Sequence, residues 1–297
     1  MRKFNMQNII IWIKNDKGGY KFRYRDDFDK MQRYLKLQIE HSINLGWLKE
    51  DIVVITNFPF EYMGVKANVA TDICGWSAFA NKLVVINEMI KRGIINDNFW
   101  LHDADAYQLV PFNFPQDCND VGYVRHAPGR NKLQGGSAFF RKEAFDIVEV
   151  IATGNKLFRI TKEESFFSVF FEEIGGAKVI KKYGAKWTKV KNSLKCSKKK
   201  KNQIREQYRF AKRCFGKYRQ RFGWLNYTYN LSQQRMFARK YPKAEKPIKV
   251  VHFHTEYVST MNCFYKGLNN HKVKIVTDDL EKMFIKHGFI SSDEQRC

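Results

Sequence analysis

The chain lacks several features that would assign it to a class at once. Its 297 residues include six cysteines, and no two of them form a Cys-x-x-Cys pair, which argues against a zinc site. No stretch approaches the roughly 20 apolar residues of a membrane-spanning helix. The apolar run at residues 8–13 is too short for a signal peptide and lies where a first core strand is expected. We therefore expect a cytoplasmic protein with free thiols.

Acidic residues are nearly missing from one long segment. Between Lys178 and Lys246 there are 23 Lys and Arg residues but only two acidic ones, Glu206 and Glu245. The formal net charge of the whole chain is +23, so almost all of the excess lies in this segment. A field of this kind attracts nucleic acid, anionic lipid or a charged glycan. The alternative is a solvated basic face over core aromatic residues.

The rest of the chain has the pattern of an α/β domain. Apolar residues make up 44% of the sequence, which is enough for a sizeable core. The apolar runs at 9–13 and 52–55 and the stretch Asn98–His102 predict buried strands, and residues 28–45 and 78–90 carry apolar side chains at helical spacing. Strands that alternate with helices predict right-handed βαβ units and a mostly parallel, Rossmann-like sheet with flanking helices.

Later segments complete this prediction. We expect a tight loop at Gln134–Ser137 and strands at 121–125, 137–141 and 248–253. We expect helices at 142–152, 162–174, 205–222 and 278–287. The predicted organisation is a core at 1–177, a basic helical insertion at 178–246 and a return to the core at 247–297.

Two carboxylates follow the third predicted strand. Asp103-x-Asp105 comes directly after the apolar run that ends at His102. Ligands of parallel sheets bind beyond the carboxyl ends of strands. Two acids at such a position can hold one hard divalent cation that binds phosphate oxygens. The alternative is a surface turn with two acidic residues.

The stretch ANKLVVINEMIKRGIINDNFWLHDADAYQL, residues 80–109, resembles the core of GT-A glycosyltransferases. The resemblance covers about residues 8–175 and 248–257. It implies Mn²⁺ or Mg²⁺ and a nucleoside-diphosphate sugar, expected to be linked to UDP. It implies that Asp105 is the main metal ligand, that Asp103 contacts the ribose or shares the metal, and that Lys82 lies near the sugar or the phosphates. Ala104, between the two acids, is included in the nucleotide-sugar site.

The same resemblance suggests further site residues. His252, or as a second choice His254, corresponds to a metal-binding histidine on a late strand, although Thr255 replaces the glycine of the family pattern. Gly135 and Gly136 would border the donor sugar. Glu163 and Glu164 occupy the place of an acidic pair that deprotonates the acceptor hydroxyl. Each has a structural alternative: a strand histidine bonded to a carbonyl, a hairpin turn, and acids favoured at a helix start.

The expected base and ribose contacts are Trp12, Asn15, Thr56, Asn57, Asp72 and Trp76.

The basic segment is the expected acceptor-binding part. Its cations can contact phosphates and its aromatic residues can stack on exposed bases. The candidate contacts are Lys198, Lys199, Lys200, Lys201, Arg205, Arg209, Arg213, Lys217 and Arg221. The favoured hypothesis is a transferase that glycosylates a hydroxymethylated base in DNA, flipped from the duplex. The alternatives are a transferase for a cell-surface or lipid-linked glycan at an anionic membrane, and a nucleic-acid-binding protein on an inactive transferase scaffold. No protein partner can be inferred.

Overall fold

The computed structural model describes residues 3–14, 28–76, 80–127, 130–159, 176–193, 195–232, 247–253 and 277–289. A seven-stranded sheet in the order β10-β8-β9-β6-β1-β2-β5 forms its centre. The strands are β1 (Gln7–Trp12), β2 (Ile52–Thr56), β5 (Asn68–Val69), β6 (Phe99–His102), β8 (Val121–Ala127), β9 (Arg130–Phe140) and β10 (Phe222–Leu225). Only β9 runs against its neighbours in this sheet, because β5, β2, β1 and β6 pair in parallel and β10 is parallel to β8. The predicted mixed α/β class with a mostly parallel sheet is therefore confirmed.

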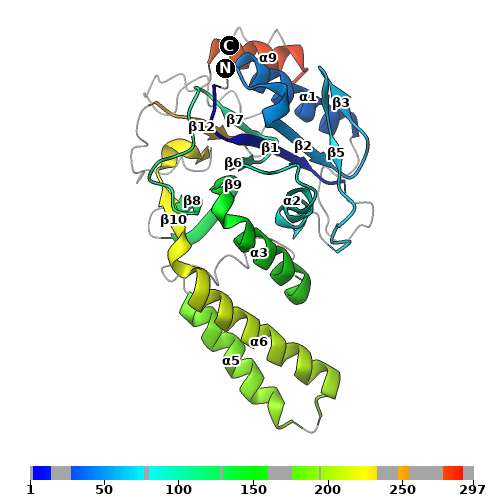
Figure 1. The fold of residues 1–297 in the computed structure, drawn as a ribbon, viewed down its shortest axis with the longest axis vertical. Coiled ribbons are helices and arrows are strands. Elements are labelled where there is room, and N and C mark those ends of the chain that lie inside the picture. The colour runs from blue at the N-terminus through cyan, green and yellow to red at the C-terminus, as the bar shows by residue number, and fades with distance from the viewer. Residues whose placement is uncertain are drawn as a thin grey trace.

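Helices cover both faces of this sheet (Figure 1). Neighbouring residues of a strand point to opposite faces, and the continuous apolar strands use both. Ile9 faces the cluster formed with α2 (Lys82–Lys91) and α3 (Phe145–Phe158). Ile10 faces the cluster formed with α1 (Phe28–Asn44). This two-sided burial explains why the sequence shows uninterrupted apolar runs in place of alternation.

A second sheet with three strands lies beside the first. Its order is β11-β12-β7, where β7 is Ala106–Gln108, β11 is Leu231–Ser232 and β12 is Val250–His252. β12 pairs antiparallel with β7, which begins one residue after Asp105. The helix α9 (Asp278–Lys286) packs through Leu280 and Phe284 on this sheet and on Leu37 of α1. The late strand and the last described helix are thus attached next to the acidic pair.

Residues 134–137 differ from the predicted tight loop. They lie inside β9, and the pairing with β8 shifts there, from Tyr123–Ala138 to Val124–Gln134. Extra residues on one strand of an antiparallel pair form a β-bulge, which bends the strand and redirects its side chains. The two glycines of this stretch therefore belong to a bulged strand and not to a turn.

The remaining helices and short elements connect these parts. Residues 205–222 do not form one helix: α6 ends at Tyr218 and Phe222 begins β10. Residues 142–152 begin as a 3-10 turn and α3 continues to Phe158. The other elements are η1 (Lys49–Asp51), β3 (Glu61–Tyr62), β4 (Val65–Lys66), η3 (Lys142–Ala144), α5 (Gly176–Lys191), α6 (Lys198–Tyr218), η4 (Arg219–Arg221) and η5 (Tyr227–Tyr229).

The basic segment has two structural parts. The helices α5 and α6 pack against each other and project from the body as a hairpin (Figure 1). The residues that follow return to the body, because β10 is an edge strand of the central sheet and β11 pairs with β12. Within the described part of the chain, none of the helices combines the length and the apolar character needed to cross a bilayer. The division at residues 177 and 246 remains a prediction.

Candidate functional site

Asp103, Asp105 and His252 meet at the carboxyl end of β6. One ligand atom from each of them lies within 4.8 Å of the others. His252 Nε2 is 3.2 Å from Asp105 Oδ1 and 3.7 Å from Asp103 Oδ2. The Asp103 side chain is 28% exposed, whereas those of Asp105 and His252 are 11% and 4% exposed. One side of the group is therefore open and the other is buried.

Helix α1 holds the turn that carries the two aspartates in place. Gln38 Nε2 donates to the carbonyl oxygens of Ala104 (2.8 Å) and Ala106 (2.9 Å). The Asp103 amide donates to Gly136 O on β9 (3.1 Å). Each of these bonds uses a backbone group that strand pairing leaves open, so the turn is held on two sides. The carboxylates are positioned before any ligand arrives.

The histidine that precedes the pair supports the same turn. His102 is 1% exposed, and its Nε2 lies 2.7 Å from Asn8 Oδ1 on β1. Asn8 in turn donates to Ser42 Oγ of α1 (3.0 Å). Burial lowers the pKa of His102 to about 4. A neutral imidazole there links β6, β1 and α1 without adding charge beside the acids.

His252 reaches the acids because β12 pairs with β7. Its register partner is Ala106, and the Phe253 amide donates to Asp105 O (3.0 Å). Burial lowers the pKa of His252, but the charges of Asp105 and Asp103 and the hydrogen bond with Asp105 outweigh it and raise the pKa above its ordinary value. The ring is thus held in an anionic environment that would equally favour a metal cation.

Among the described residues, Lys82 is a cation that contacts this group directly. It lies at the start of α2, where its ammonium pairs with Asp103 and is 3.4 Å from Gly135 O. The Lys82 side chain is 19% exposed, so most of it is covered. A positive group beside the open carboxylate can contact an incoming phosphate. The structure therefore brings together several predicted site residues, which include Lys82, Asp103, Asp105, Gly135, Gly136 and His252.

The donor set fits a divalent cation of the Mn²⁺ type. Two carboxylates and one imidazole supply hard and borderline ligands, and together they leave coordination positions for phosphate oxygens and water. Gly136 provides the space for the ring, because a Cβ atom at that position would lie 2.1 Å from His252 Nδ1. In the described part of the chain, this is the group of three or more such side chains that can hold a metal.

The predicted nucleotide contacts on the first two strands lie at the same sheet edge. Trp12 ends β1 and stacks on Tyr34 of α1 at 5.6 Å. Thr56 ends β2 and is buried. Asn57 follows it and bonds both backbone groups of Lys14, with Oδ1 accepting from the amide (2.7 Å) and Nδ2 donating to the carbonyl (2.8 Å). These bonds join the two loops beyond β1 and β2.

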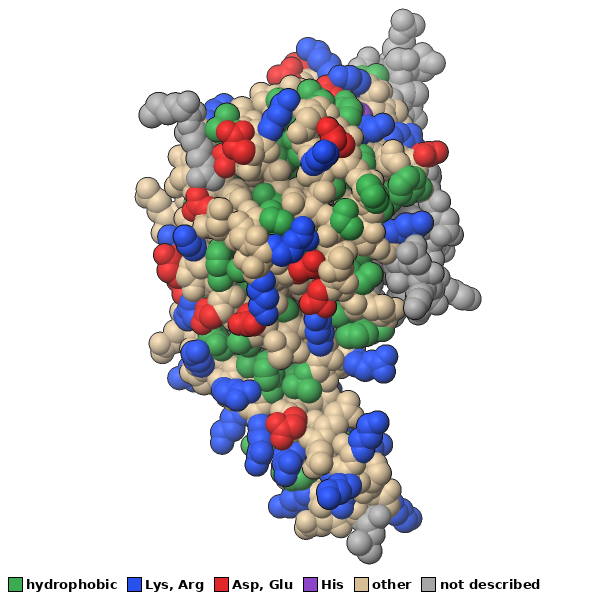
Figure 2. Space-filling view, turned by 45° about the vertical axis from the view of Figure 1, so that its right-hand side comes forward, with side chains coloured by type: hydrophobic (Ala, Val, Ile, Leu, Met, Phe, Trp, Pro, Cys, Tyr) green, Lys and Arg blue, Asp and Glu red, His purple; other side chains and the backbone are tan. Residues whose placement is uncertain are grey.

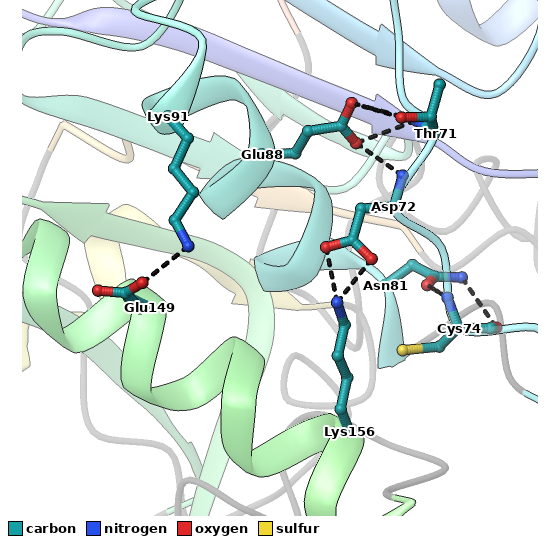
Figure 3. Close-up of polar contacts among 8 residues, drawn as sticks. All are labelled: Thr71, Asp72, Cys74, Asn81, Glu88, Lys91, Glu149 and Lys156. Atoms are coloured by element: carbon teal, nitrogen blue, oxygen red, sulfur yellow. Dashed lines mark hydrogen bonds and ion pairs between the residues drawn. The ribbon is translucent and has the colours of Figure 1, made fainter.

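Asp72 and Trp76 have structural partners in the loop after β5. Both carboxylate oxygens of Asp72 are 2.6 Å from Lys156 Nζ on α3, and its amide donates to Glu88 of α2 (Figure 3). The guanidinium of Arg159 lies 5.4 Å from the Trp76 ring centre. The loop is thus fastened to α2 and α3. The contacts of Asp72 and Trp76 with a nucleotide remain predictions.

Most candidate acceptor contacts lie on α6. Lys198, Lys199 and Lys200 are exposed in its first turn. Arg221 is different, because its guanidinium bonds Asp120, both oxygens of Asp146 (2.9 and 2.8 Å) and Glu143 O. These contacts give Arg221 a role in joining the base of α6 to the body.

Asn15, Glu163, Glu164 and His254 lie outside the described residues, so their roles remain predictions.

Two glutamines support this site although the sequence analysis assigned neither of them a role. Gln38 holds the aspartate turn, and Gln134 is 3% exposed with its Nε2 3.3 Å from His252 Nδ1. Gln38 lies between Leu37 and Ile39, and Gln134 follows Leu133; a glutamine beside apolar residues is a detectable signal, because buried polar groups are hydrogen-bonded. The sequence could therefore have marked both as buried polar residues, but not their partners.

Comparisons with known proteins show distant similarities. No family model and no curated protein matches the chain. A solved glycosyltransferase involved in the glycosylation of the major capsid of PBCV-1 superposes with a TM-score of 0.40 and 13% identity, covering 83% of this chain and 92% of that chain. An active-site mutant of LgtC superposes with a TM-score of 0.45 and 8% identity, covering 97% of each chain. Similarities this distant leave the function to be argued from the site itself.

Proposed function

We propose that the protein is a metal-dependent glycosyltransferase that uses a nucleoside-diphosphate sugar. The observation that carries the proposal is the convergence of Asp103, Asp105 and His252 at the carboxyl end of β6. A like-charged pair at a strand end is unfavourable alone, and a cation relieves the repulsion. The open side of Asp103 and the neighbouring Lys82 then give a diphosphate access to positive charge.

The reaction assigns separate tasks to the groups of this site. The acceptor hydroxyl attacks the anomeric carbon, the bond from that carbon to the diphosphate oxygen breaks, and the hydroxyl proton passes to a base. A divalent cation held by the three residues would offset the charge that grows on the departing diphosphate. Lys82 would donate a hydrogen bond to the same phosphates. The base is expected at Glu163 or Glu164, and this assignment rests on the sequence.

The donor is expected to be a UDP-sugar bound along the sheet edge. Trp12, Thr56 and Asn57 lie at the ends of β1 and β2, on the side where β6 presents its acids. Gly135 and Gly136 bring the β9 backbone close to the same point, since Gly136 O accepts from the Asp103 amide. This arrangement supports a base on the β1–β2 side and a sugar toward β9.

The acceptor we favour is a hydroxymethylated base in DNA. The basic segment supports it, since a near-neutral body carries one strongly cationic appendage. A glycan at an anionic membrane is the competing acceptor. A panel of both acceptors, offered with UDP-sugars and Mn²⁺, separates the two by the product that forms.

The decisive experiment measures release of nucleoside diphosphate from a panel of sugar nucleotides. Mn²⁺ should stimulate release by the wild type, and Asp105→Asn should lower it at least about a hundredfold. Asp117→Asn, an exposed acid outside the group, should behave as the wild type. Release that persists with a chelator, or that survives Asp105→Asn, would disprove the metal assignment. Calorimetry should show Mn²⁺ binding that Asp105→Asn abolishes.

A further inference from the structure

The projecting hairpin is the most cationic part of the described structure. The α5–α6 arm, residues 176–218, contains 16 Lys and Arg residues and a single acidic residue, Glu206. Like charges at this density repel one another and cost stability. Glu206 relieves little of this, because it pairs with only two of the 16 cations, lying 3.5 Å from Arg205 Nε and 3.6 Å from Arg209 Nη1. Among the described residues, the arm therefore carries a large positive charge that acidic side chains do not balance.

Most of these cations are exposed to solvent. Figure 2 shows Lys and Arg side chains over the projecting end of the molecule, with far fewer acidic ones there than on the body. Both helices contribute to this surface. The exposed basic residues of the arm are Lys181, Lys182, Lys186, Lys189, Lys191, Lys195, Lys198, Lys199, Lys200, Arg209, Lys212, Arg213 and Lys217.

The apolar face of the arm is used for its own packing. Ile204, Phe210 and Cys214 of α6 are buried, and the Phe210 ring lies 6.1 Å from Phe158 of α3. Gln207 also donates to Leu157 O (3.2 Å). Helix α5 joins the same cluster, since the rings of Tyr183 and Phe158 are 5.1 Å apart. The arm is thus fixed to the body at the end of α3 and presents charge, not apolar surface, to a partner.

This distribution argues against insertion into a membrane. A helix that lies in a lipid interface needs an outward apolar face with Trp, Phe or Leu. The exposed large apolar side chains of the described residues are Phe28, Leu48, Met63, Val69 and Ile73, and none belongs to the arm. The partner of the arm is therefore a polyanion held by charge.

The length of the arm points to an extended polyanion. The 21 residues of α6 span about 30 Å, close to the roughly 34 Å of one duplex turn. Duplex DNA presents a phosphate every 1.7 Å or so along its axis. We propose that the α5–α6 arm binds the phosphate backbone of duplex DNA. The proposal names a partner for the acceptor side of the proposed transferase, but it rests on the arm alone and requires no sugar transfer.

The test measures the affinity of the full-length protein for a labelled 20-bp duplex between about 50 and 200 mM salt. Wild-type affinity should fall by orders of magnitude over this range. One variant replaces Lys198, Lys199, Lys200 and Lys201 with Gln, and a second does so at Lys181, Lys182, Lys186 and Lys189. Each should weaken binding at least tenfold at about 100 mM salt. Each should also reduce the salt slope by roughly 0.9 for every phosphate that the variant no longer neutralises.

A matched control removes the same charge from the body. It replaces Lys49, Lys66, Lys91 and Lys282 with Gln, four exposed lysines outside the arm. The control should bind DNA within about threefold of the wild type, while circular dichroism confirms that all three variants fold. Equal losses of DNA affinity in the arm and control variants would overturn the proposal, because they would show that DNA is attracted by the net charge of the whole protein and not by the arm. Affinity that does not depend on salt would also overturn it.

Other polyanions serve as competing probes. Vesicles rich in anionic lipid, or heparin, that bind through the arm while the duplex does not would overturn the assignment to DNA. Failure of the proposed transferase is distinguishable from failure of this proposal. If both hold, Asp105→Asn should lose Mn²⁺ binding and keep DNA affinity, whereas Mn²⁺ binding that survives Asp105→Asn would contradict the transferase alone. The arm variants should show the reverse, with Mn²⁺ binding intact and DNA affinity reduced.

Discussion

The imidazole of His252 lies directly against the backbone of Gly136. A Cβ atom at position 136 would be 2.1 Å from both Cε1 and Nδ1 of the ring, far closer than atoms can approach. The His252 side chain is 4% exposed and its strand is paired with β7, so the ring has little room to move. The bulge in β9 therefore sets the position of a proposed metal ligand on a strand more than a hundred residues later.

Gly136→Ala should displace this ligand. We expect the variant to bind Mn²⁺ at least tenfold more weakly, because even small shifts of a ligand cost metal affinity. The control is Gly216→Ala on the exposed face of α6, where a Cβ atom meets nothing within 4 Å. Alanine in a helix is favoured over glycine, so the control should unfold at the same or a slightly higher temperature. Unchanged Mn²⁺ affinity in Gly136→Ala would disprove the role of this contact.

The core of the fold could be predicted because its signals are local. The apolar runs at 9–13 and 52–55 and the stretch Asn98–His102 correspond to β1, β2 and β6, and the spacing at residues 28–45 corresponds to α1. The position of the acidic pair followed from the same pattern, since it comes directly after a strand that is buried on both faces. These features depend on residues close together in the sequence.

What could not be predicted depends on distant partners. The bulge at Gln134–Ser137 arises from pairing with β8 and looked like a loop because of its two glycines. Asp72 lies 84 residues from Lys156, and Arg221 lies 101 residues from Asp120. A single sequence shows that these residues are charged, but not which opposite charge the fold brings to them.

Lys82 offers a test of the phosphate side of the site. It pairs with Asp103, so Lys82→Gln removes a cation that competes with a metal for that carboxylate. We expect Mn²⁺ to bind the variant as tightly as the wild type or more tightly when nucleotide is absent. Affinity for a UDP-sugar with Mn²⁺ should fall about tenfold or more, because a charge-assisted hydrogen bond to phosphate is removed.

Lys91→Gln is the matched control for this substitution. Lys91 lies on the same helix and pairs with Glu149 of α3 at 2.7 Å (Figure 3). Its loss should change neither affinity, because an exposed ion pair contributes little. A Lys82 variant that binds the donor normally would show that this lysine only balances Asp103.

Glu40 of α1 fastens α9 to the body. Its carboxylate accepts from Tyr62 and contacts Lys286 and His287 of the C-terminal helical region. Burial raises the pKa of Glu40. The hydrogen bonds from Lys286, Tyr62 and His287 together lower this pKa by more than burial raises it, so the pKa lies below its ordinary value. The ionised form is thus favoured in the folded protein, and its contribution to stability is present above about pH 4.3 and is lost as the pH falls through the folded pKa.

Urea unfolding of Glu40→Gln should show this pH dependence. The variant should be less stable than the wild type by about 1 kcal/mol at pH 7, and the difference should shrink below about pH 4. Glu61→Gln is the control, since that side chain is 54% exposed and 3.8 Å from Lys66. The control should change the free energy of unfolding by less than about 0.5 kcal/mol. A difference that stays constant from pH 7 to pH 3 would contradict the role of the ionised carboxylate.

Gln134 should determine which nitrogen of His252 is available to a metal. Its Nε2 faces His252 Nδ1 at 3.3 Å, and its Oε1 is buried with no hydrogen-bond partner among the described residues. His252 Nε2 faces the two aspartates, so metal binding there requires the proton on Nδ1, and a rotated amide would accept it through Oε1. We expect Gln134→Leu to weaken Mn²⁺ binding roughly tenfold to a hundredfold, whereas Gln134→Glu, which keeps an acceptor, binds within a few-fold of the wild type. Calorimetric titration with Mn²⁺ distinguishes these outcomes from a packing effect, because leucine and glutamate would then weaken binding alike.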